Sequence, residues 1–170
     1  MGKNKVAEQY VSFETAKLLK DHGFAQGCSL SYHPLSRRLD SRWSDNITSG
    51  YIAAPTQQVA VRWLKDIHYI HVSAELNSTK PNYRYHILVL EPQENPDEPD
   101  YHFRIKESID NKVETRYDGT YESHLKEAKD MYDTYEFALE EALKYALKNL
   151  LKRYNERILT YLDAGMEYSR

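Results

Sequence analysis

Residues 51–90 read YIAAPTQQVAVRWLKDIHYIHVSAELNSTKPNYRYHILVL, and the spacing of apolar residues changes once along this stretch. Pro55 precedes Thr56, a residue type that caps helices by accepting a backbone hydrogen bond, so a helix is predicted to begin here. Its apolar residues recur at helical spacing and are Val59, Ala60, Trp63, Leu64 and Ile67. The opposite side carries Arg62, Lys65 and Asp66. The stretch therefore opens with an amphipathic helix that ends near His68.

Beyond His68 the apolar period falls from 3.6 to 2, which predicts two alternating strands over residues 70–76 and 83–90. Folding them about the turn between them places Leu76 opposite Tyr83. One face then has the apolar pairs Ala74 with Tyr85, Val72 with Ile87 and Ile70 with Val89. The other face pairs Glu75 with Arg84, Ser73 with His86, His71 with Leu88 and Tyr69 with Leu90. A slip of one residue would mix the two faces, so this antiparallel register is the predicted one.

Before the central stretch, residues 12–23 are predicted to form a first helix. Ser12 is its N-cap and Gly23 stands where a left-handed residue ends a helix. Residues 25–50 contain many turn-forming residues and predict a loop-rich segment with one irregular hairpin. After the central stretch, residues 91–100 read EPQENPDEPD and are predicted to be an exposed acidic loop, because three prolines disfavour a central strand.

Two further strands are predicted, over residues 101–106 and 113–117. In the first of them the apolar side comprises Tyr101, Phe103 and Ile105, and the other side comprises His102, Arg104 and Lys106. Residues 121–129 favour a short helical turn.

A long helix is predicted to begin at Asp133, which forms a D-x-x-E capping pair with Glu136, and Tyr132 is placed to contact Phe137. Its apolar stripe continues toward Gly165, so the helix is either interrupted near Asn155 or packs on a partner chain. A solvated charged face is expected from Glu140, Glu141, Lys144, Lys148 and Lys152. The predicted fold is a single α+β domain over residues 1–170, with a three- to four-stranded antiparallel sheet, helices on one face of it and a long C-terminal helix.

Composition narrows the class of protein. Hydrophobic residues are 41% and charged residues 29% of the chain, which is typical of globular domains. The net charge is -3 and the pI about 6.2, so no overall attraction to nucleic acid or to an anionic membrane is expected. The first residues lack an apolar run and no stretch has the length of a membrane span, so neither a secretory signal nor a membrane protein is expected. The single cysteine, Cys28, fits a reducing cytoplasm.

Motifs for chemistry are missing from the sequence. It contains no G-x-S-x-G, no phosphate-binding glycine loop and no H-E-x-x-H. His71, His86 and His102 fall on one predicted sheet face, but they are spread too widely along the strands to hold one zinc ion. No catalytic residue, no metal site and no cofactor are therefore predicted, and an enzyme is not favoured.

The face of the predicted sheet turned away from the helices is the candidate working surface. We call it the outer sheet face and assign to it Tyr69, His71, Arg84, His86, Leu88, Arg104 and Lys106. Cations interleaved with aromatic groups suit single-stranded nucleic acid, which needs charge for phosphates and flat rings for bases. The same mixture suits a protein interface. A third interpretation is that the first helix or residues 25–50 cover this face.

Three blocks of the sequence carry a resemblance to known proteins. They are YVSFETAKLLKDHGF at residues 10–24, IAAPTQQVAVRWLKDIH at 52–68 and YDTYEFALEEALKYALKNL at 132–150. In that order they resemble a set of uncharacterised phage and prophage proteins of gut Bacteroidetes. The resemblance implies a bacterial cytoplasmic or phage-encoded origin and supplies no catalytic residue. The favoured function is a non-enzymatic interaction protein that self-associates or binds a protein partner, and the alternative is a module that binds single-stranded nucleic acid.

Overall fold

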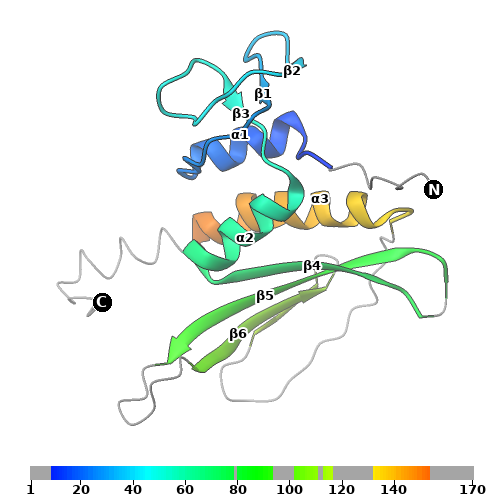
Figure 1. The fold of residues 1–170 in the computed structure, drawn as a ribbon. Helices are drawn as coiled ribbons and strands as arrows, with labels where there is room; N and C mark the ends of the chain where they lie inside the picture. The colour runs from blue at the N-terminus through cyan, green and yellow to red at the C-terminus, as the bar shows by residue number, and fades with distance from the viewer. Residues whose placement is uncertain (1–8, 79, 94–101, 111–112, 117–131, 154–170) are drawn as a thin grey trace, which may run out of the picture.

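A computed structural model of the chain describes residues 9–78, 80–93, 102–110, 113–116 and 132–153, and these form an α+β fold in layers (Figure 1). The helices are α1 (Phe13–Asp21), α2 (Gln57–His68) and α3 (Tyr135–Tyr145), and α3 runs on into the π-helical segment η1 (Ala146–Leu150). A small antiparallel sheet of order β2-β1-β3 consists of β1 (Ser31–Tyr32), β2 (Leu39–Asp40) and β3 (Ile52–Ala53). A larger antiparallel sheet of order β4-β5-β6-β7 consists of β4 (Ile70–Leu76), β5 (Tyr83–Gln93), β6 (His102–Asp110) and β7 (Val113–Arg116).

The layers follow from which faces are apolar. α2 and α3 lie on one face of the larger sheet, α1 lies across them on the side away from the sheet, and β1–β3 lie beyond α1 (Figure 1). α1 and residues 25–50 therefore do not cover the outer sheet face, and that interpretation is wrong. The predicted hairpin within residues 25–50 is β1 with β2, whereas β3 was not predicted.

The first helix forms as predicted. The Ser12 hydroxyl accepts a hydrogen bond from the Thr15 amide, and Gly23 has a positive φ of 88° directly after the helix. The Phe24 amide donates to the Leu19 carbonyl at 2.9 Å and the Gly23 amide donates to the Lys20 carbonyl at 3.0 Å. These two bonds make a Schellman C-terminus, which requires the left-handed residue that glycine supplies without strain.

The central helix also begins where predicted, because the Thr56 hydroxyl accepts from the Val59 amide. Its buried stripe includes Ala60, Trp63 and Leu64. Ile67 is 59% exposed, so its predicted place on the buried side is wrong. The last turn of α2 lies at the end of the helical layer, where the chain leaves α2 for β4 (Figure 1).

The register of β4 and β5 agrees with the prediction at every pair. Leu76 pairs with Tyr83, Glu75 with Arg84, Ser73 with His86 and Ile70 with Val89, with the intervening pairs in step. The Leu90 amide donates to the Tyr69 carbonyl at 2.9 Å, which completes the ladder. The inner face is the core of the sheet, where Ile70, Val72, Tyr85, Ile87 and Val89 are buried.

A bulge in β6 changes the predicted alternation of that strand. Val89 pairs with Glu107 and Leu90 pairs with Ile105, so Lys106 is the extra residue. Ile105 consequently lies opposite Leu90, is 41% exposed and does not join the core as predicted. Ile109 takes the buried position opposite Ile87, which extends β6 beyond the predicted end. The fourth strand was predicted close to its observed place.

The predicted acidic loop begins later than expected, because β5 continues to Gln93 and contains Pro92. Pro92 is tolerated there because the pairing of β5 with β4 extends only as far as Val89. Beyond Val89, no described strand lies beside β5 on the side of β4, so the missing amide of Pro92 has no ladder partner to lose. Residues 94–100 and the predicted helical turn at 121–129 lie outside the described residues.

α3 is capped by Thr134, one residue after the predicted Asp133, because the Thr134 hydroxyl accepts from the Phe137 amide at 3.1 Å. The predicted contact between Tyr132 and Phe137 is confirmed, with ring centroids 5.4 Å apart. The buried stripe of α3 and η1 includes Leu139, Leu143, Ala146, Leu147 and Leu150. The expected interruption near Asn155 lies outside the described residues.

Candidate functional site

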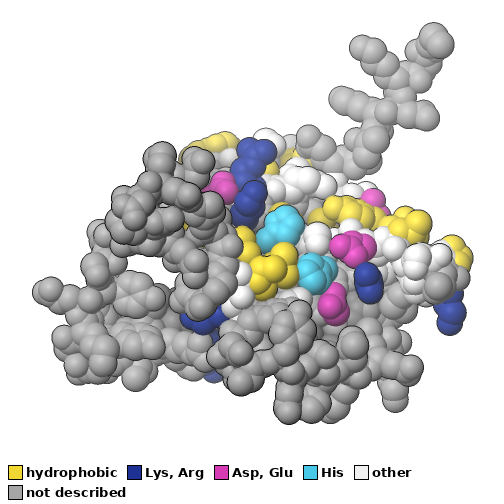
Figure 2. All heavy atoms as spheres, turned by 90° about the horizontal axis from the view of Figure 1, so that it is seen from below, with side chains coloured by type: hydrophobic (Ala, Val, Ile, Leu, Met, Phe, Trp, Pro, Cys, Tyr) yellow, Lys and Arg dark blue, Asp and Glu magenta, His cyan; other side chains and the backbone are white. Residues whose placement is uncertain are grey.

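β4 and β5 bring four of the predicted site residues together. His71, Arg84, His86 and Leu88 occupy alternate positions of the paired strands on the outer sheet face, and Figure 2 shows this face with histidine, apolar and charged side chains side by side. Tyr69 lies at the junction of α2 and β4 in a left-handed conformation. The remaining two residues lie on β6, where Lys106 is the bulge residue. Arg104 pairs with Glu91, and Ile105 takes the place opposite Leu90, so the predicted register position of Arg104 on the outer sheet face is wrong.

Carboxylates of the same face lie close to Arg84 and His86. The His86 ring nitrogen Nδ1 lies 2.6 Å from Asp110 Oδ1, and Arg84 forms a 3.2 Å ion pair with Glu75. The Glu75 pair was expected from the register. The Asp110 contact was missed, because the predicted third strand ended at residue 106 and left Asp110 outside it. The outer sheet face therefore carries charges of both signs.

His71 is the second histidine of this face, and its surroundings disfavour a positive charge. Burial lowers the pKa of His71, and the nearby Lys65 ammonium and His86 lower that pKa further. The backbone of His102 pairs with Gln93 at the opposite end of β6 from Asp110, so the three histidines considered for zinc are not brought together. Among the described residues no group of three or more potential metal ligands is present.

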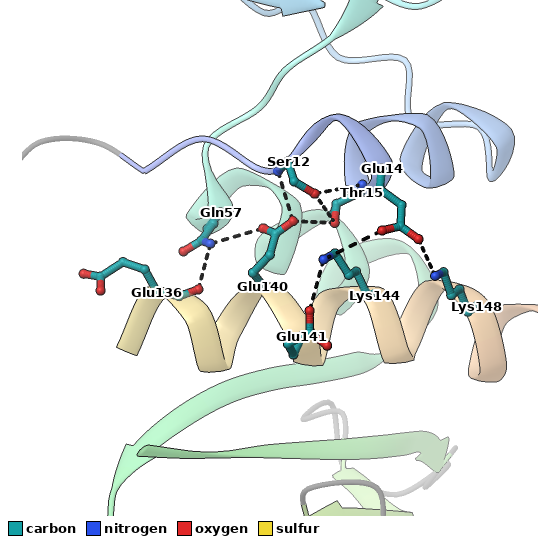
Figure 3. A network of polar contacts seen from close by, with 9 residues as sticks. All are labelled: Ser12, Glu14, Thr15, Gln57, Glu136, Glu140, Glu141, Lys144 and Lys148. Atoms are coloured by element: carbon teal, nitrogen blue, oxygen red, sulfur yellow. Dashed lines mark hydrogen bonds and ion pairs between the residues drawn. The ribbon is translucent and has the colours of Figure 1, made fainter. Parts of the chain in front are cut away.

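A buried polar cluster joins α1, α2 and α3 on the other side of the helical layer (Figure 3). One oxygen of Glu140 accepts from the Ser12 amide at 3.0 Å and from Thr15 Oγ1 at 2.6 Å. The other accepts from Gln57 Nε2 at 3.2 Å. Glu140 is 8% exposed, so its predicted place on a solvated face is wrong. Both oxygens are engaged by groups of the chain itself, and the cluster therefore holds the helices together.

The neighbouring charges of α3 and η1 remain near the surface, as predicted. Lys144 pairs with Glu141 at 3.0 Å, and both Lys144 and Lys148 pair with Glu14 of α1. These lysines are therefore neutralised by carboxylates of the same cluster.

A groove of about 430 Å³ lies between α2 and β4, and we call it the α2–β4 groove. Its lining includes Val72 and Leu139, which are buried, with Tyr135 from the start of α3. Its α2 side is formed by Gln58, Val61, Arg62, Lys65 and Asp66, and its β4 side by His71 and Ser73. Sequence reasoning placed Arg62, Lys65 and Asp66 on the polar side of α2 but missed the groove, since no sequence pattern indicates that β4 is an edge strand.

Comparisons of the chain with protein-family models, with curated proteins and with solved structures found no match. None of the described helices is both long and apolar enough to cross a bilayer. Function is therefore inferred from the chemistry of the outer sheet face and of the α2–β4 groove.

Proposed function

We propose that this protein is a non-enzymatic interaction protein of phage or prophage type, which self-associates or binds a protein partner through the outer sheet face. The observation that carries the proposal is that Arg84 and His86 of that face each contact a carboxylate of the chain itself, beside apolar side chains that are not fully buried. Arg84 is matched by Glu75 and His86 by Asp110, within a surface that also presents Leu88, Leu90 and Ile105.

Binding of single-stranded nucleic acid requires cations that are available to phosphates. The carboxylate beside Arg84 opposes this, because a phosphate would have to displace Glu75 from Arg84 while being repelled by it. The described part of the outer sheet face therefore lacks the excess positive charge on which nucleic-acid affinity depends.

The mixture of apolar and charged side chains on the outer sheet face suits a protein interface. Interfaces combine partly apolar centres with a polar rim, and complementary charges set orientation and partner choice. Leu88 and Leu90 are half-buried and Ile105 is exposed, so a partner surface would remove further apolar area from water. Histidine and arginine pairs around them supply the polar rim.

Sedimentation velocity at micromolar concentration tests self-association. The wild type is expected to form a species larger than the 20.0 kDa chain, and Ile105→Glu is expected to shift it toward the monomer. Leu35→Glu is the matched control, because Leu35 is also exposed and lies in the segment between β1 and β2, remote from the larger sheet. Circular dichroism checks that both variants stay folded.

A wild type that remains monomeric counts against self-association and leaves a different protein as partner. Tight, salt-sensitive binding of an oligo-dT strand that Arg84→Glu abolishes would overturn the proposal and establish the nucleic-acid alternative.

A further inference from the structure

β4 is the first strand of the larger sheet, and in the part of the chain that the structure describes no strand lies on its second side. The hydrogen bond from the Leu90 amide to the Tyr69 carbonyl fixes which residues of β4 bond to β5. In an antiparallel ladder these alternate, so the backbone groups of His71, Ser73 and Glu75 point toward β5. The N–H and C=O groups of Ile70, Val72, Ala74 and Leu76 therefore point to the open edge.

Edge strands are usually protected against added strands. Protection takes the form of prolines, charged side chains, lysines above all, bulges, very short strands or a covering helix or loop. β4 has seven residues, IHVSAEL, paired to β5 without a break, and contains neither proline nor lysine. Its one charged residue, Glu75, is paired with Arg84, so within the described residues this edge is open to a further strand.

The α2–β4 groove runs beside this edge. Val72, whose backbone faces the edge, also lines the groove with its buried side chain, together with Leu139. An extended segment next to β4 would place alternate side chains toward α2, in contact with Val61 and Tyr135. A helix flank beside an open strand edge is the arrangement in which several domain classes bind peptides by strand addition.

The charge of the groove defines the chemistry of that segment. Arg62 and Lys65 are exposed on the α2 side beside one carboxylate, Asp66, and neither cation forms an ion pair with any described residue, so two cations and one carboxylate leave this side with a net positive charge. This contrasts with Arg84, Lys144 and Lys148, which all have carboxylate partners. Three residues along a helix rise about 4.5 Å and alternate strand residues are about 6.8 Å apart, so flexible basic side chains at Arg62 and Lys65 reach acids two residues apart.

We propose that the α2–β4 groove binds an extended, acidic segment of a partner protein, which adds to the free edge of β4 as a fifth strand of the larger sheet. Backbone hydrogen bonds to Ile70, Val72 and Ala74 supply the affinity, and Arg62 and Lys65 select acidic side chains at alternate positions. The site goes beyond the proposed function, because it lies on the sheet edge and does not depend on self-association.

A second copy of the chain is a poorer occupant. Pairing β4 with the same strand of another molecule about a twofold axis would bring the Arg62 and Lys65 flanks of both α2 helices toward each other. The chain's own acidic stretch, residues 91–100, is interrupted by Pro92, Pro96 and Pro99, which lack the amides that a ladder requires. Charge and backbone chemistry together therefore favour a separate acidic segment without proline.

The test uses fluorescence anisotropy of the full chain with a fluorescein-labelled nonapeptide of alternating Glu and Val. Binding is expected, and the corresponding Lys and Val peptide is expected not to bind. Arg62→Glu and Lys65→Glu are each expected to weaken binding about tenfold, because each replaces an attraction with a repulsion. Lys17→Glu is the matched control, since it makes the same charge change on an exposed position of α1 and should leave affinity within about twofold.

Strand addition is separated from simple charge attraction by N-methylation of the peptide. Methyl groups on every second amide block either the amides that face β4 or the amides that face away from it. The first of these two methylation registers should abolish binding, and the second should leave it largely unchanged. The amides of Val72 and Ala74 should also gain protection from hydrogen exchange when the acidic peptide is bound.

Three results would overturn the proposal. One is equal binding of both N-methylated registers, the second is unchanged affinity in Arg62→Glu and Lys65→Glu, and the third is displacement of the peptide by an oligo-dT strand at lower concentration than by unlabelled peptide. Loss of self-association in Ile105→Glu with peptide binding intact would leave this site standing, so the two proposals fail separately.

Discussion

Thr15 Oγ1 donates a 2.6 Å hydrogen bond to the carboxylate of Glu140, across 125 residues of sequence. The same carboxylate accepts from the Ser12 amide and from Gln57, so one side chain of α3 binds the start of α1 and the start of α2 (Figure 3). A buried carboxyl group needs hydrogen-bond donors in place of water, and here donors from the starts of two helices supply them.

Glu140→Gln is expected to destabilise the fold by about 1–3 kcal/mol, because the new amide group must face either Gln57 Nε2 or the two donors of α1. Urea unfolding measures the loss. Glu136→Gln is the control on the same helix. Its side chain is exposed in the first turn, so the change should cost about 0.5 kcal/mol or less. Equal effects of the two substitutions would contradict the role assigned to Glu140.

Two fully buried serines should respond oppositely to alanine. The Ser31 hydroxyl has no hydrogen-bond partner within the described chain, whereas the Ser44 hydroxyl lies 2.7 Å from Ser49 Oγ and donates to the Tyr51 carbonyl at 3.0 Å. Ser31→Ala is expected to be neutral or to stabilise by up to about 1 kcal/mol, and Ser44→Ala to destabilise by about 1–2 kcal/mol. Thermal unfolding of the two variants side by side measures the difference, and a comparable loss in both would refute it.

Gly23 and Gly50 provide a matched pair for backbone strain. A Cβ at either position would meet no atom within 4 Å, but only Gly23 has a positive φ, of 88°. Gly23→Ala should therefore cost about 1 kcal/mol or more, since the left-handed turn ends α1, while Gly50→Ala should change stability by about 0.5 kcal/mol at most. Chemical denaturation distinguishes the two, and an unaffected Gly23→Ala variant would rule out the strain argument.

Stability should fall as the pH falls below neutrality, and His68 should contribute to the fall. Its ring contacts Trp63, with centroids 4.6 Å apart, and its Nε2 is buried with no hydrogen-bond partner among the described residues. Burial lowers the pKa of His68, and the neighbouring His22 lowers that pKa further. The unfolded chain therefore binds the proton more readily. The contribution of neutral His68 to stability is fully present above the pKa of the unfolded chain, about 6.5, and is lost as the pH falls through the lowered pKa of the folded protein.

His68→Phe retains a ring beside Trp63 and removes the titrating group. The dependence of unfolding free energy on pH, measured by urea between about pH 7.5 and pH 5, should be shallower in this variant than in the wild type. His71 has a lowered pKa for the same main reason and should retain its share of the dependence. An unchanged slope in His68→Phe would show that the proton is not excluded at this position.

Local chemistry was predictable wherever neighbours in sequence decide the conformation. Ser12 and Thr56 cap their helices because each hydroxyl accepts a hydrogen bond from the amide three residues ahead, and Gly23 ends α1 because it adopts positive φ without strain. The start of α3 was displaced by one residue, since Asp133 and Thr134 are both good caps and only the tertiary geometry selects between them.

The candidate surfaces were predictable in part. The register of β4 and β5 follows from alternation on both faces, and it correctly placed His71, Arg84, His86 and Leu88 together. The bulge at Lys106 shifted β6 by one position, which no pattern within β6 indicates, and the Asp110 partner of His86 was missed with it.

The amino-acid sequence by itself determined the order of the three helices and of the strands of the larger sheet, the caps of α1 and α2, and the pairing of β4 with β5, because these depend on residues that are close along the chain or that alternate in step. Tertiary structure alone decided that Glu140 is buried and that β4 is an edge strand beside Arg62 and Lys65. The donors to Glu140 come from helices distant in sequence, and an edge exists only once the order of the strands is set. Both are therefore properties of how elements meet, which no single segment encodes.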